Sequence, residues 1–274
     1  MIKLLPTTNL LDSKTELGLI ASSKFGKITH NLVFFKYQAT GNDFILIEDE
    51  EFDPKWVKPL CKRRYGIGAD GLIWSRPSHV ATRKMTFFNC DGQEASMCLN
   101  GLRTLFFHTA SLSSPYITIE TAVGIYKGSK SGLFLPPPSF RKSLTINNLR
   151  GELFNTGVEH YIVESELQDL AIDELGRELR HHKALEPAGA NINFVQKMAP
   201  DEIWVRTYER GVEGETMSCG TGAYACHAYL GVSKSKVRFF HGDELYFEDK
   251  PEGTFIKGAV AFVYRGSLCS ESIS

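Results

Sequence analysis

The sequence predicts an α/β (α+β) protein built from two similar halves. Apolar runs typical of strands alternate with stretches of helical spacing along the 274 residues. Three consecutive prolines, Pro136–Pro138, interrupt this alternation near the middle of the chain. The pattern E-x-x-x-C-x-x-G occurs once on each side of them, at 94–101 and at 215–222. Because both copies open a helix candidate, the pattern indicates a duplicated unit.

In the first half, we expect short strands around one long helix. That helix covers Leu99–Ala110, where Leu102, Leu105 and Phe106 recur at helical spacing. A short basic helix end is expected over Pro59–Arg64, and a Gly-Asn-Asp turn separates the first two strands. The expected strands are Val33–Tyr37, Phe44–Ile47, Leu72–Ser75, Met85–Phe88, Tyr116–Ile119, Gly124–Tyr126 and Leu133–Leu135.

The second half repeats this alternation. One helix is expected over Gln168–Glu178, with Leu170, Ile172 and Leu175 on its apolar side, and another over Gly222–Leu230. The expected strands are Tyr161–Val163, Ile192–Val195, Ile203–Tyr208, Phe239–Phe240, Tyr246–Phe247 and Val260–Tyr264.

The proline run also predicts the domain boundary. Proline can neither continue a sheet nor enter a helix interior, so we place the boundary at about residue 140. Residues 1–33 contain helix and strand breakers and little periodicity. We expect them to form a weakly structured N-terminal extension of unknown role.

Composition excludes several classes of protein. Lys+Arg number 31 and Asp+Glu 32, so no basic excess marks a nucleic-acid-binding protein. A hydrophobic content of 42% argues against a disordered chain. No apolar run is long enough for a membrane span or a signal peptide, so we expect a cytoplasmic location. The six cysteines, which show no C-x-x-C spacing, are then expected to be free thiols.

A glycine-rich segment imitates a dinucleotide-binding motif. Residues 66–71 satisfy G-x-G-x-x-G, and Asp91 follows at about the required distance. That motif needs a strand before it and a helix after it, whereas here a basic segment precedes it and a strand follows. We therefore interpret these glycines as a tight turn and expect no nicotinamide cofactor. No spacing of Cys and His typical of a metal site is present, so no bound metal is expected.

The repeated cysteines, Cys98 and Cys219, carry the strongest chemical signal. Each precedes a helix candidate, where the helix dipole favours the thiolate and lowers the pKa of the thiol. The backbone N–H groups that follow, in Leu99–Gly101 and Gly220–Gly222, have no intrahelical partner and form a site for an anion. Each half would therefore offer a thiol beside an anion site.

Two such thiols suit one type of reaction. Inversion of a carbon next to a carboxylate needs a base on one face of that carbon and an acid on the other. The helix ends would stabilise the negative charge that grows on the carboxylate. The alternative is two buried structural cysteines in a duplicated fold. The flanking glycines and the repetition of the motif favour the catalytic interpretation.

Six segments carry a resemblance to a known family. They are Gly41–Phe44, Arg64–Gly71, Phe88–Cys98, Asn191–Gln196, Tyr208–Gly211 and Glu215–Gly222. In this order they span nearly all of Phe34–Ser274, and they resemble diaminopimelate epimerases, the pyridoxal-phosphate-independent enzymes of lysine and cell-wall (peptidoglycan) synthesis.

The resemblance implies two pseudo-symmetric domains, each a curved mixed sheet around a central helix, with the active site in the cleft between them. The domains would be 34–140 and 141–257, with a last strand at about 258–274 returning to the first domain.

The resemblance also implies roles for individual residues. Cys98 and Cys219 are then the acid/base pair, and the bound enantiomer decides which of them is the base. Glu209 and His160 tune the pKa values of the thiols. The expected substrate-binding residues are Asn42, Asn89, Leu99, Asn100, Asn191, Glu209, Arg210, Gly220 and Thr221. Of these, the residues next to the cysteines surround the reacting carboxylate, and the other asparagines and Arg210 contact polar atoms that include the distal end of the substrate.

Three features depart from the family pattern. The family usually has Gly after its first catalytic Cys, where this chain has Leu99. The family's G-N-P-H appears as Gly157–His160, so Val158 replaces an Asn that normally contacts the distal end of the substrate. The first 33 residues have no counterpart in the family.

The resemblance therefore predicts an isomerase that converts LL- to meso-diaminopimelate without a cofactor. It also predicts a homodimer, with Tyr264 at the subunit contact. The alternative on the same scaffold is a racemase of another amino acid, such as glutamate or proline, and glutamate could be a second substrate because Val158 is apolar. A non-catalytic binding module is disfavoured because both cysteines are present.

Overall fold

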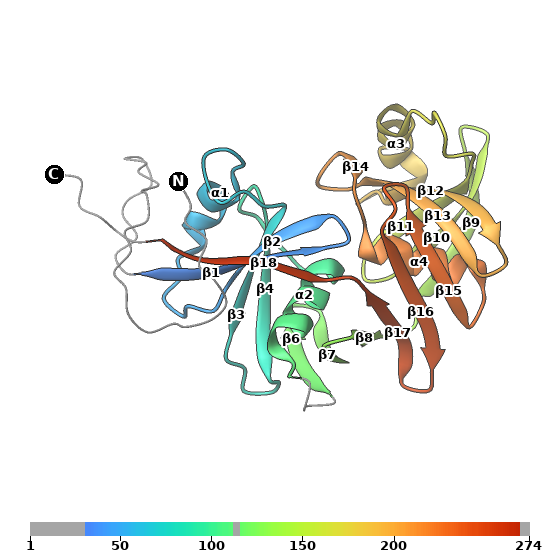
Figure 1. Ribbon diagram of the computed structural model, residues 1–274. Helices are drawn as coiled ribbons and strands as arrows, with labels where there is room; N and C mark the ends of the chain where they lie inside the picture. Colours follow the sequence, from blue (N-terminus) through green and yellow to red (C-terminus); the bar gives the residue numbers. More distant parts are fainter. Residues whose placement is uncertain (1–30, 112–115, 269–274) are drawn as a thin grey trace.

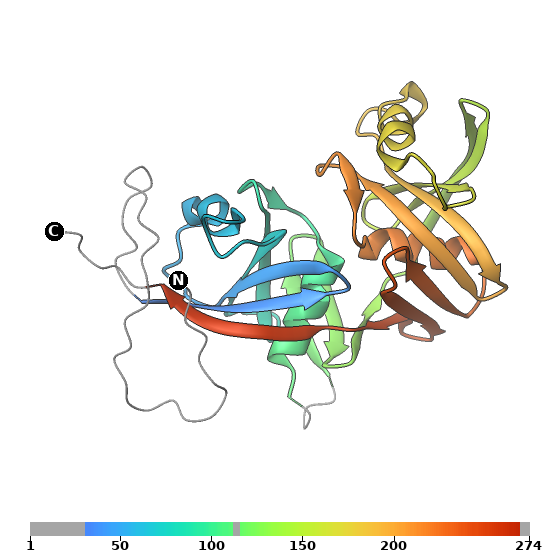
Figure 2. The ribbon, with the colours of Figure 1, turned by 45° about the horizontal axis from the view of Figure 1, so that its top comes forward.

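Two lobes lie side by side in the computed structural model, which describes residues 31–111 and 116–268 (Figures 1 and 2). Each lobe is a mixed sheet that wraps around one helix, α2 (Leu99–Thr109) in the first lobe and α4 (Gly220–Leu230) in the second. This arrangement confirms the predicted fold class.

The first lobe contains a 3₁₀ turn at Pro54–Trp56 and the short helix α1 (Val57–Cys61). Its strands are β1 (Leu32–Ala39), β2 (Asn42–Ile47), β3 (Gly71–Arg76), β4 (Arg83–Asn89), β5 (Glu94–Ala95), β6 (Ile117–Thr121), β7 (Gly124–Ser129), β8 (Gly132–Leu135) and, from the end of the chain, β18 (Ala261–Leu268).

The second lobe contains the helix α3 (Ile172–Arg180) and a 3₁₀ turn at Lys183–Leu185. Its strands are β9 (Ser139–Ile146), β10 (Leu149–Asn155), β11 (Glu159–Glu164), β12 (Asn191–Ala199), β13 (Glu202–Glu209), β14 (Gly214–Thr216), β15 (Lys234–Phe239), β16 (Glu244–Lys250) and β17 (Gly253–Gly258).

Strand pairing repeats between the lobes. The first runs in the order β18-β1-β2-β3-β4-β6-β7-β8, and the second in the order β9-β10-β11-β12-β13-β15-β16-β17. The parallel pairs occur at corresponding places, at β2–β3 and β4–β6 in one lobe and at β11–β12 and β13–β15 in the other. Each parallel connection passes through a helix, as parallel strands require. The pairing therefore supports the predicted duplication.

The chain crosses between the lobes twice. Pro136–Pro138 lead from β8 directly into β9, and 259–260 lead from β17 into β18, which returns to pair with β1 (Figure 1). The lobes are also joined by the antiparallel pair β8–β17.

The central helices are buried on nearly all sides. Every residue of α2 from Leu99 to Phe106 is buried, and α4 is buried from Gly222 to His227. A helix enclosed in this way is apolar or small around most of its circumference, with buried polar exceptions such as Arg103. Its polar N-terminus is then the part that can reach a cavity.

Sequence spacing located most elements but missed five strands, namely β5, β9, β10, β14 and β17. β5 and β14 are only two and three residues long. β9 was not expected because its residues are largely exposed and polar, with no apolar face to give a period of two. β10 pairs with it, and β17 is short and bounded by glycines. The predicted break near residue 140 is therefore a direct connection into a hairpin.

Helix boundaries also differ from the expectation. α3 begins at Ile172, since the backbone carbonyls of Leu167 and Leu170 accept hydrogen bonds from Arg206. α4 begins at Gly220, two residues earlier than expected. α1 ends at Cys61, before the basic residues that were assigned to it.

Other expectations concern the glycine-rich segment and the ends of the chain. Residues 66–71 form a loop before β3, with Gly68 at a φ of +79°, in accord with the predicted turn. Most of the expected N-terminal extension and residues 269–274 lie outside the described residues. No helix in the described ranges is long and apolar enough to cross a membrane.

We expect the substitution Gly176→Ala to destabilise the second lobe. Alanine normally stabilises a helix relative to glycine, but a Cβ at Gly176 in α3 would lie 2.4 Å from the Cβ of Tyr208. Overpacking of this kind costs about 1–3 kcal/mol of unfolding free energy. Urea denaturation measures it, with Glu174→Ala on the exposed face of α3 as the control. An unchanged or higher stability for Gly176→Ala would contradict this packing.

Candidate active site

Two helix N-termini meet between the lobes. Cys98 precedes α2 and Cys219 precedes α4, both in extended conformation, with φ of −138° and −118°. Gly101 and Gly222 occupy the third position of each helix, and a Cβ on either would lie 3.4 Å from the neighbouring cysteine sulfur. Glycine therefore leaves the space beside each thiol open, in matching positions of the two lobes.

Gly220 sets how closely the two helices approach. A Cβ there would lie 2.9 Å from Asn100 Oδ1 and 3.1 Å from Leu99 Cβ, both at the start of α2. A Cβ would make both contacts closer than is normal, so glycine at this position favours the close approach of the two helices. Leu99 itself packs into the apolar core around α2. The first lobe can therefore accommodate a leucine at the position where the second lobe has glycine.

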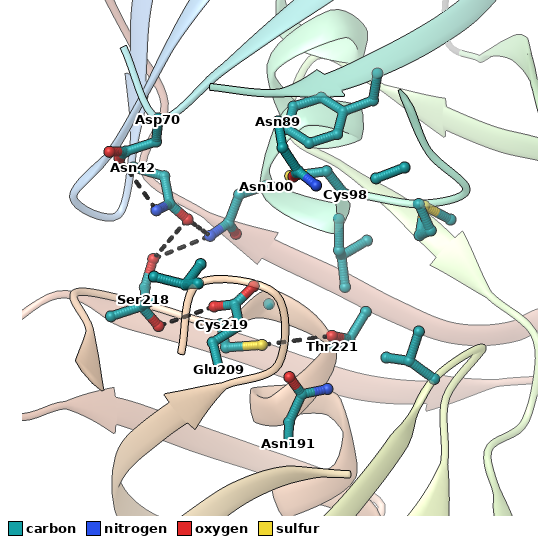
Figure 3. A pocket seen from close by; sticks show the side chains of 18 of the residues that line it. Asn42, Asp70, Asn89, Cys98, Asn100, Asn191, Glu209, Ser218, Cys219 and Thr221 are labelled. Carbon is teal, nitrogen blue, oxygen red and sulfur yellow. Dashed lines mark hydrogen bonds between the residues drawn. The ribbon is translucent and has the colours of Figure 1, made fainter. Parts of the chain in front are cut away.

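A cavity of about 570 Å³ surrounds the two cysteines (Figure 3). It is lined by every residue that was predicted to be catalytic or to bind substrate. These are Asn42, Asn89, Cys98, Leu99, Asn100, Asn191, Glu209, Arg210, Cys219, Gly220 and Thr221. The fold thus brings together residues from both lobes that are far apart in the sequence.

His160 lies behind the cavity instead. It is fully buried on β11, and its Nδ1 lies 3.1 Å from Asn193 Nδ2. Burial, together with the positive charge of Arg210, lowers the pKa of His160 to about 3, so the ring is uncharged at neutral pH. His160 is connected to α4 through Asn193. The Oδ1 atom of Asn193 lies 2.4 Å from the position that a Cβ on Gly222 would occupy.

Tyr264 lies far along β18 in the first lobe. It is half-buried, and its ring meets the ring of Phe34 edge to face at 5.9 Å. It does not line the cavity.

A polar network joins the lobes beside the thiols (Figure 3). Asn100 Nδ2 donates to Asn42 Oδ1 at 2.7 Å and to Ser218 Oγ at 2.9 Å. Asn42 Nδ2 in turn donates to Asp70 Oδ2 at 3.4 Å. Because Ser218 belongs to the second lobe, these carboxamides hold the lobes together in this state.

Asn191 anchors the loop that carries Arg210. Its Oδ1 accepts a hydrogen bond from the backbone N–H of Arg210 at 2.8 Å, and its Nδ2 donates to the carbonyl of Glu159 at 3.2 Å. The Arg210 guanidinium makes one long hydrogen bond, 3.5 Å to the carbonyl of Gly189, and has no carboxylate partner in the described part of the chain. This part of the cavity therefore offers an uncompensated cation, which suits an anionic group.

Burial raises the pKa of both thiols, contrary to the sequence expectation. The pKa of Cys98 rises to about 12, although the backbone N–H groups of Gly101 and Asn100 act in the opposite direction. The pKa of Cys219 also lies well above its usual value, because burial and then the charge of Glu209 oppose the thiolate. Removal from water thus outweighs the helix ends, and both cysteines are thiols at neutral pH in this structure.

Glu209 is the buried carboxyl beside Cys219. Burial raises the pKa of this carboxyl to about 6, against hydrogen bonds from Thr216 and from the Cys219 thiol. Its Oε2 accepts from Thr216 Oγ1 at 2.9 Å. A carboxylate with this pKa can accept a proton near neutral pH. Cys98 has no comparable side-chain partner in the described residues, so the two thiols are not equivalent.

Sequence reasoning missed several residues of the cavity. Asp70 and Ser218 lie within segments that matched the family pattern, but no role was assigned to either. Thr156 donates to the carbonyl of Thr221 at 3.2 Å and so fixes the β10–β11 turn over the start of α4. No spacing signal marks these residues, because their neighbours in space come from distant strands.

Among the described residues, no group of His, Cys, Asp and Glu is arranged to hold a metal ion.

Known proteins resemble this chain in sequence. The family model described as "Diaminopimelate epimerase" matches residues 34–128 and 153–246. A protein named diaminopimelate epimerase from Aquifex aeolicus is 38% identical over 87% of this chain and 98% of its own length. One from Hydrogenobaculum sp. is 34% identical over 88% of this chain and 99% of its own.

Solved structures resemble it in fold. A phenazine biosynthesis protein of the PhzF family from Bacillus anthracis has a TM-score of 0.66 at 15% identity, covering 88% of this chain and 99% of that one. A hydroxyproline epimerase from Agrobacterium vitis, with bound trans-4-hydroxy-L-proline, has a TM-score of 0.66 at 12% identity, covering 90% and 93%. These similarities support the two-lobed fold.

We expect Glu209→Gln to stabilise the protein at neutral pH. The folded-state pKa of about 6 lies above the ordinary 4.5, so the folded state favours the protonated carboxyl. The carboxylate therefore costs stability as the pH rises through this window, and the full cost is present above about pH 6. Partial exposure reduces the effect, and we expect a gain of about 1 kcal/mol at pH 7.5 and none at pH 4.

Urea denaturation at both pH values measures this difference. Glu244→Gln is the control, because its pKa is lowered by Tyr246 and Arg238, so its loss should not stabilise the protein. If Glu209→Gln is less stable than the wild type at pH 7.5, the folded protein stabilises the Glu209 carboxylate, and the prediction is wrong.

Proposed function

Because the chain belongs to the diaminopimelate epimerase family, we propose that it converts LL-2,6-diaminopimelate to the meso isomer in lysine biosynthesis. It is an isomerase, as its named relatives are. One observation supports the two-thiol chemistry above all: Cys98 and Cys219 lie at the N-termini of two helices that meet in one cavity.

The substrate carboxylate next to the reacting carbon would bind between the helix ends. The first N–H groups of a helix have no intrahelical acceptor, and those of Leu99, Asn100, Gly220 and Thr221 line the same cavity. When the α-proton leaves, negative charge moves onto this carboxylate, and the two helix ends stabilise it.

Substrate binding also explains how a buried thiol becomes a base. The α-ammonium group of the substrate brings a positive charge beside the reacting carbon, and a nearby cation lowers the pKa of a thiol. The Cys219 thiol can pass its proton to Glu209, to which it is hydrogen-bonded. The resulting thiolate removes the α-proton, and Cys98 delivers its own proton to the opposite face of the carbon. For the other isomer the two cysteines exchange roles.

The distal end of the substrate would lie toward Arg210. This guanidinium has no carboxylate partner among the described residues and can bind the second carboxylate of diaminopimelate. Asn89 is exposed at the cavity, and its carboxamide makes no hydrogen bond within the described ranges. The proposed reaction assigns no step to a metal or another cofactor.

A second activity on smaller amino acids follows from Val158. This residue lines the cavity where the family pattern has an asparagine, so the site has one polar group fewer for the distal end. An asparagine here would lose its hydrogen-bond partner when a shorter substrate binds. Valine has no polar group that could be left unpaired. Glutamate is therefore the alternative substrate that we propose.

We further propose a homodimer that acts in the cytoplasm and also supplies peptidoglycan synthesis. Phe262 and Val263 on β18 are exposed beside Tyr264, which makes this strand a suitable subunit contact. Light scattering of the wild type and of Tyr264→Ala tests the assembly.

We expect Cys98→Ser and Cys219→Ser each to reduce epimerisation by about a hundredfold to ten-thousandfold. Each removes the acid or the base, and such a group typically contributes about 10²–10⁴ in rate. The α-proton of one isomer should still exchange, since one thiol remains. Purified protein is assayed in D₂O by NMR.

The matched control is Cys90→Ser, which changes an exposed cysteine at the same cavity. We expect it to retain activity. Full epimerisation by either Cys98→Ser or Cys219→Ser would rule out the two-thiol mechanism.

We expect Val158→Asn to favour diaminopimelate over glutamate by about tenfold or more. A hydrogen bond to a charged group contributes about 1.5–3 kcal/mol, and every 1.4 kcal/mol corresponds to about a factor of ten. The ratio of kcat/KM values for the two substrates measures this preference. If wild type and variant both leave the glutamate α-proton unexchanged, Val158 does not broaden specificity.

A further inference from the structure

Arg103 is a buried cation behind Asn100, which lines the cavity. It lies on α2 one turn after Asn100, and only 3% of its surface is exposed. No carboxylate lies within ion-pair distance of it in the described residues. An unpaired buried charge is costly to maintain, and the functional roles proposed above leave this residue without a task.

The Arg103 guanidinium contacts three separate segments. Its Nη1 donates to Asn100 Oδ1 at 3.0 Å and to Thr40 Oγ1 in the β1–β2 turn at 3.4 Å. Its Nη2 donates to the carbonyl of Ala259 at 2.8 Å. Ala259 lies where the chain returns from the second lobe to the first (Figure 1). A Cβ on the adjacent Gly258 would lie 2.7 Å from this Nη2, so glycine makes room for the contact.

Arg103 also determines how Asn100 is oriented. A carboxamide has one acceptor oxygen and one donor nitrogen. Because the guanidinium holds Oδ1, the amide nitrogen points at Ser218 Oγ, 2.9 Å away in the second lobe. Ser218 is 1% exposed and lies 3.1 Å from Thr40 through its hydroxyl. It directly precedes Cys219, while Asn100 lies two residues after Cys98.

We propose that Arg103 and Ser218 are positioning residues that set the placement of Cys98 relative to Cys219 across the two lobes. This inference rests on the proposed two-thiol reaction. Inversion needs both sulfurs aligned with one carbon at the same time, and small errors in such geometry cost large factors in rate. Removal and return of a proton by a single thiol requires only one sulfur to be in place.

The test compares these two outcomes in D₂O on diaminopimelate. NMR and chiral chromatography separate deuterium that enters with inversion from deuterium that enters with retention. We expect the ratio of inversion to retention to fall about tenfold in Ser218→Ala and up to about a hundredfold in Arg103→Met. A merely structural defect lowers both processes together and leaves their ratio unchanged.

Arg103→Lys tests whether the positive charge of Arg103 is sufficient or whether the geometry of its guanidinium is needed. Lysine keeps the charge, but a single ammonium cannot donate in the directions of both Asn100 and Ala259. We therefore expect its ratio to remain at least severalfold below that of the wild type. Full recovery by lysine would overturn the positioning role, because charge alone would then suffice.

Ser235→Ala is the matched control for Ser218→Ala. Ser235 is also a buried serine, and it hydrogen-bonds His227 near the other end of α4, at 2.9 Å. We expect it to leave the ratio unchanged. Circular dichroism and thermal unfolding identify any variant that fails to fold, and Ser218→Ala, the smallest change, then decides the question.

The possible failures can be distinguished. A wild type that neither inverts nor exchanges the α-proton refutes the proposed function. A wild type that inverts normally, with wild-type ratios in both Ser218→Ala and folded Arg103→Met, refutes the role of Arg103 and Ser218 alone.

Discussion

The close approach of two helix N-termini is the constraint on which the rest of the site depends. Gly220 allows the start of α4 to lie against Leu99 and Asn100 at the start of α2, where a Cβ would make contacts closer than is normal. The wrapped sheets hold each helix from behind, and their strands carry the polar residues that surround the contact. One anion-binding site is thus assembled from two halves, neither of which could enclose it alone.

Enclosure has an electrostatic consequence that dominates the chemistry. The same burial that lets the helix ends act strongly on a bound anion also disfavours charge on the protein's own groups. It raises the pKa of Cys98 and Glu209 and lowers that of His160. Both cysteines are therefore neutral thiols at neutral pH, and in the proposed reaction the charges of the substrate activate them.

The duplication makes the two lobes nearly symmetric, but a few residues differ between equivalent positions. Cys98 and Cys219 occupy equivalent places, as do Gly101 and Gly222. The residue after each cysteine differs, however, because only one of the two abutting helices has room for a side chain there. The carboxyl partner is likewise present on one side, at Glu209. A nearly symmetric scaffold thus offers two unequal thiols to the two faces of one carbon.

The sequence by itself determined the duplicated fold and the two helix-start cysteines. These features depend on local signals, namely hydrophobic spacing, glycines and a repeated motif, which act within a few residues. The other predicted residues of the cavity were inferred from the resemblance to a known family. Only the tertiary structure decided the protonation state of Cys98, because desolvation depends on everything that covers a group and not on its place in a helix. It also placed His160 behind the cavity and joined Arg103 to Ser218 through Asn100. The contact between Asn100 and Ser218 joins residues 118 positions apart, and it depends on a strand order that no single segment of the chain determines.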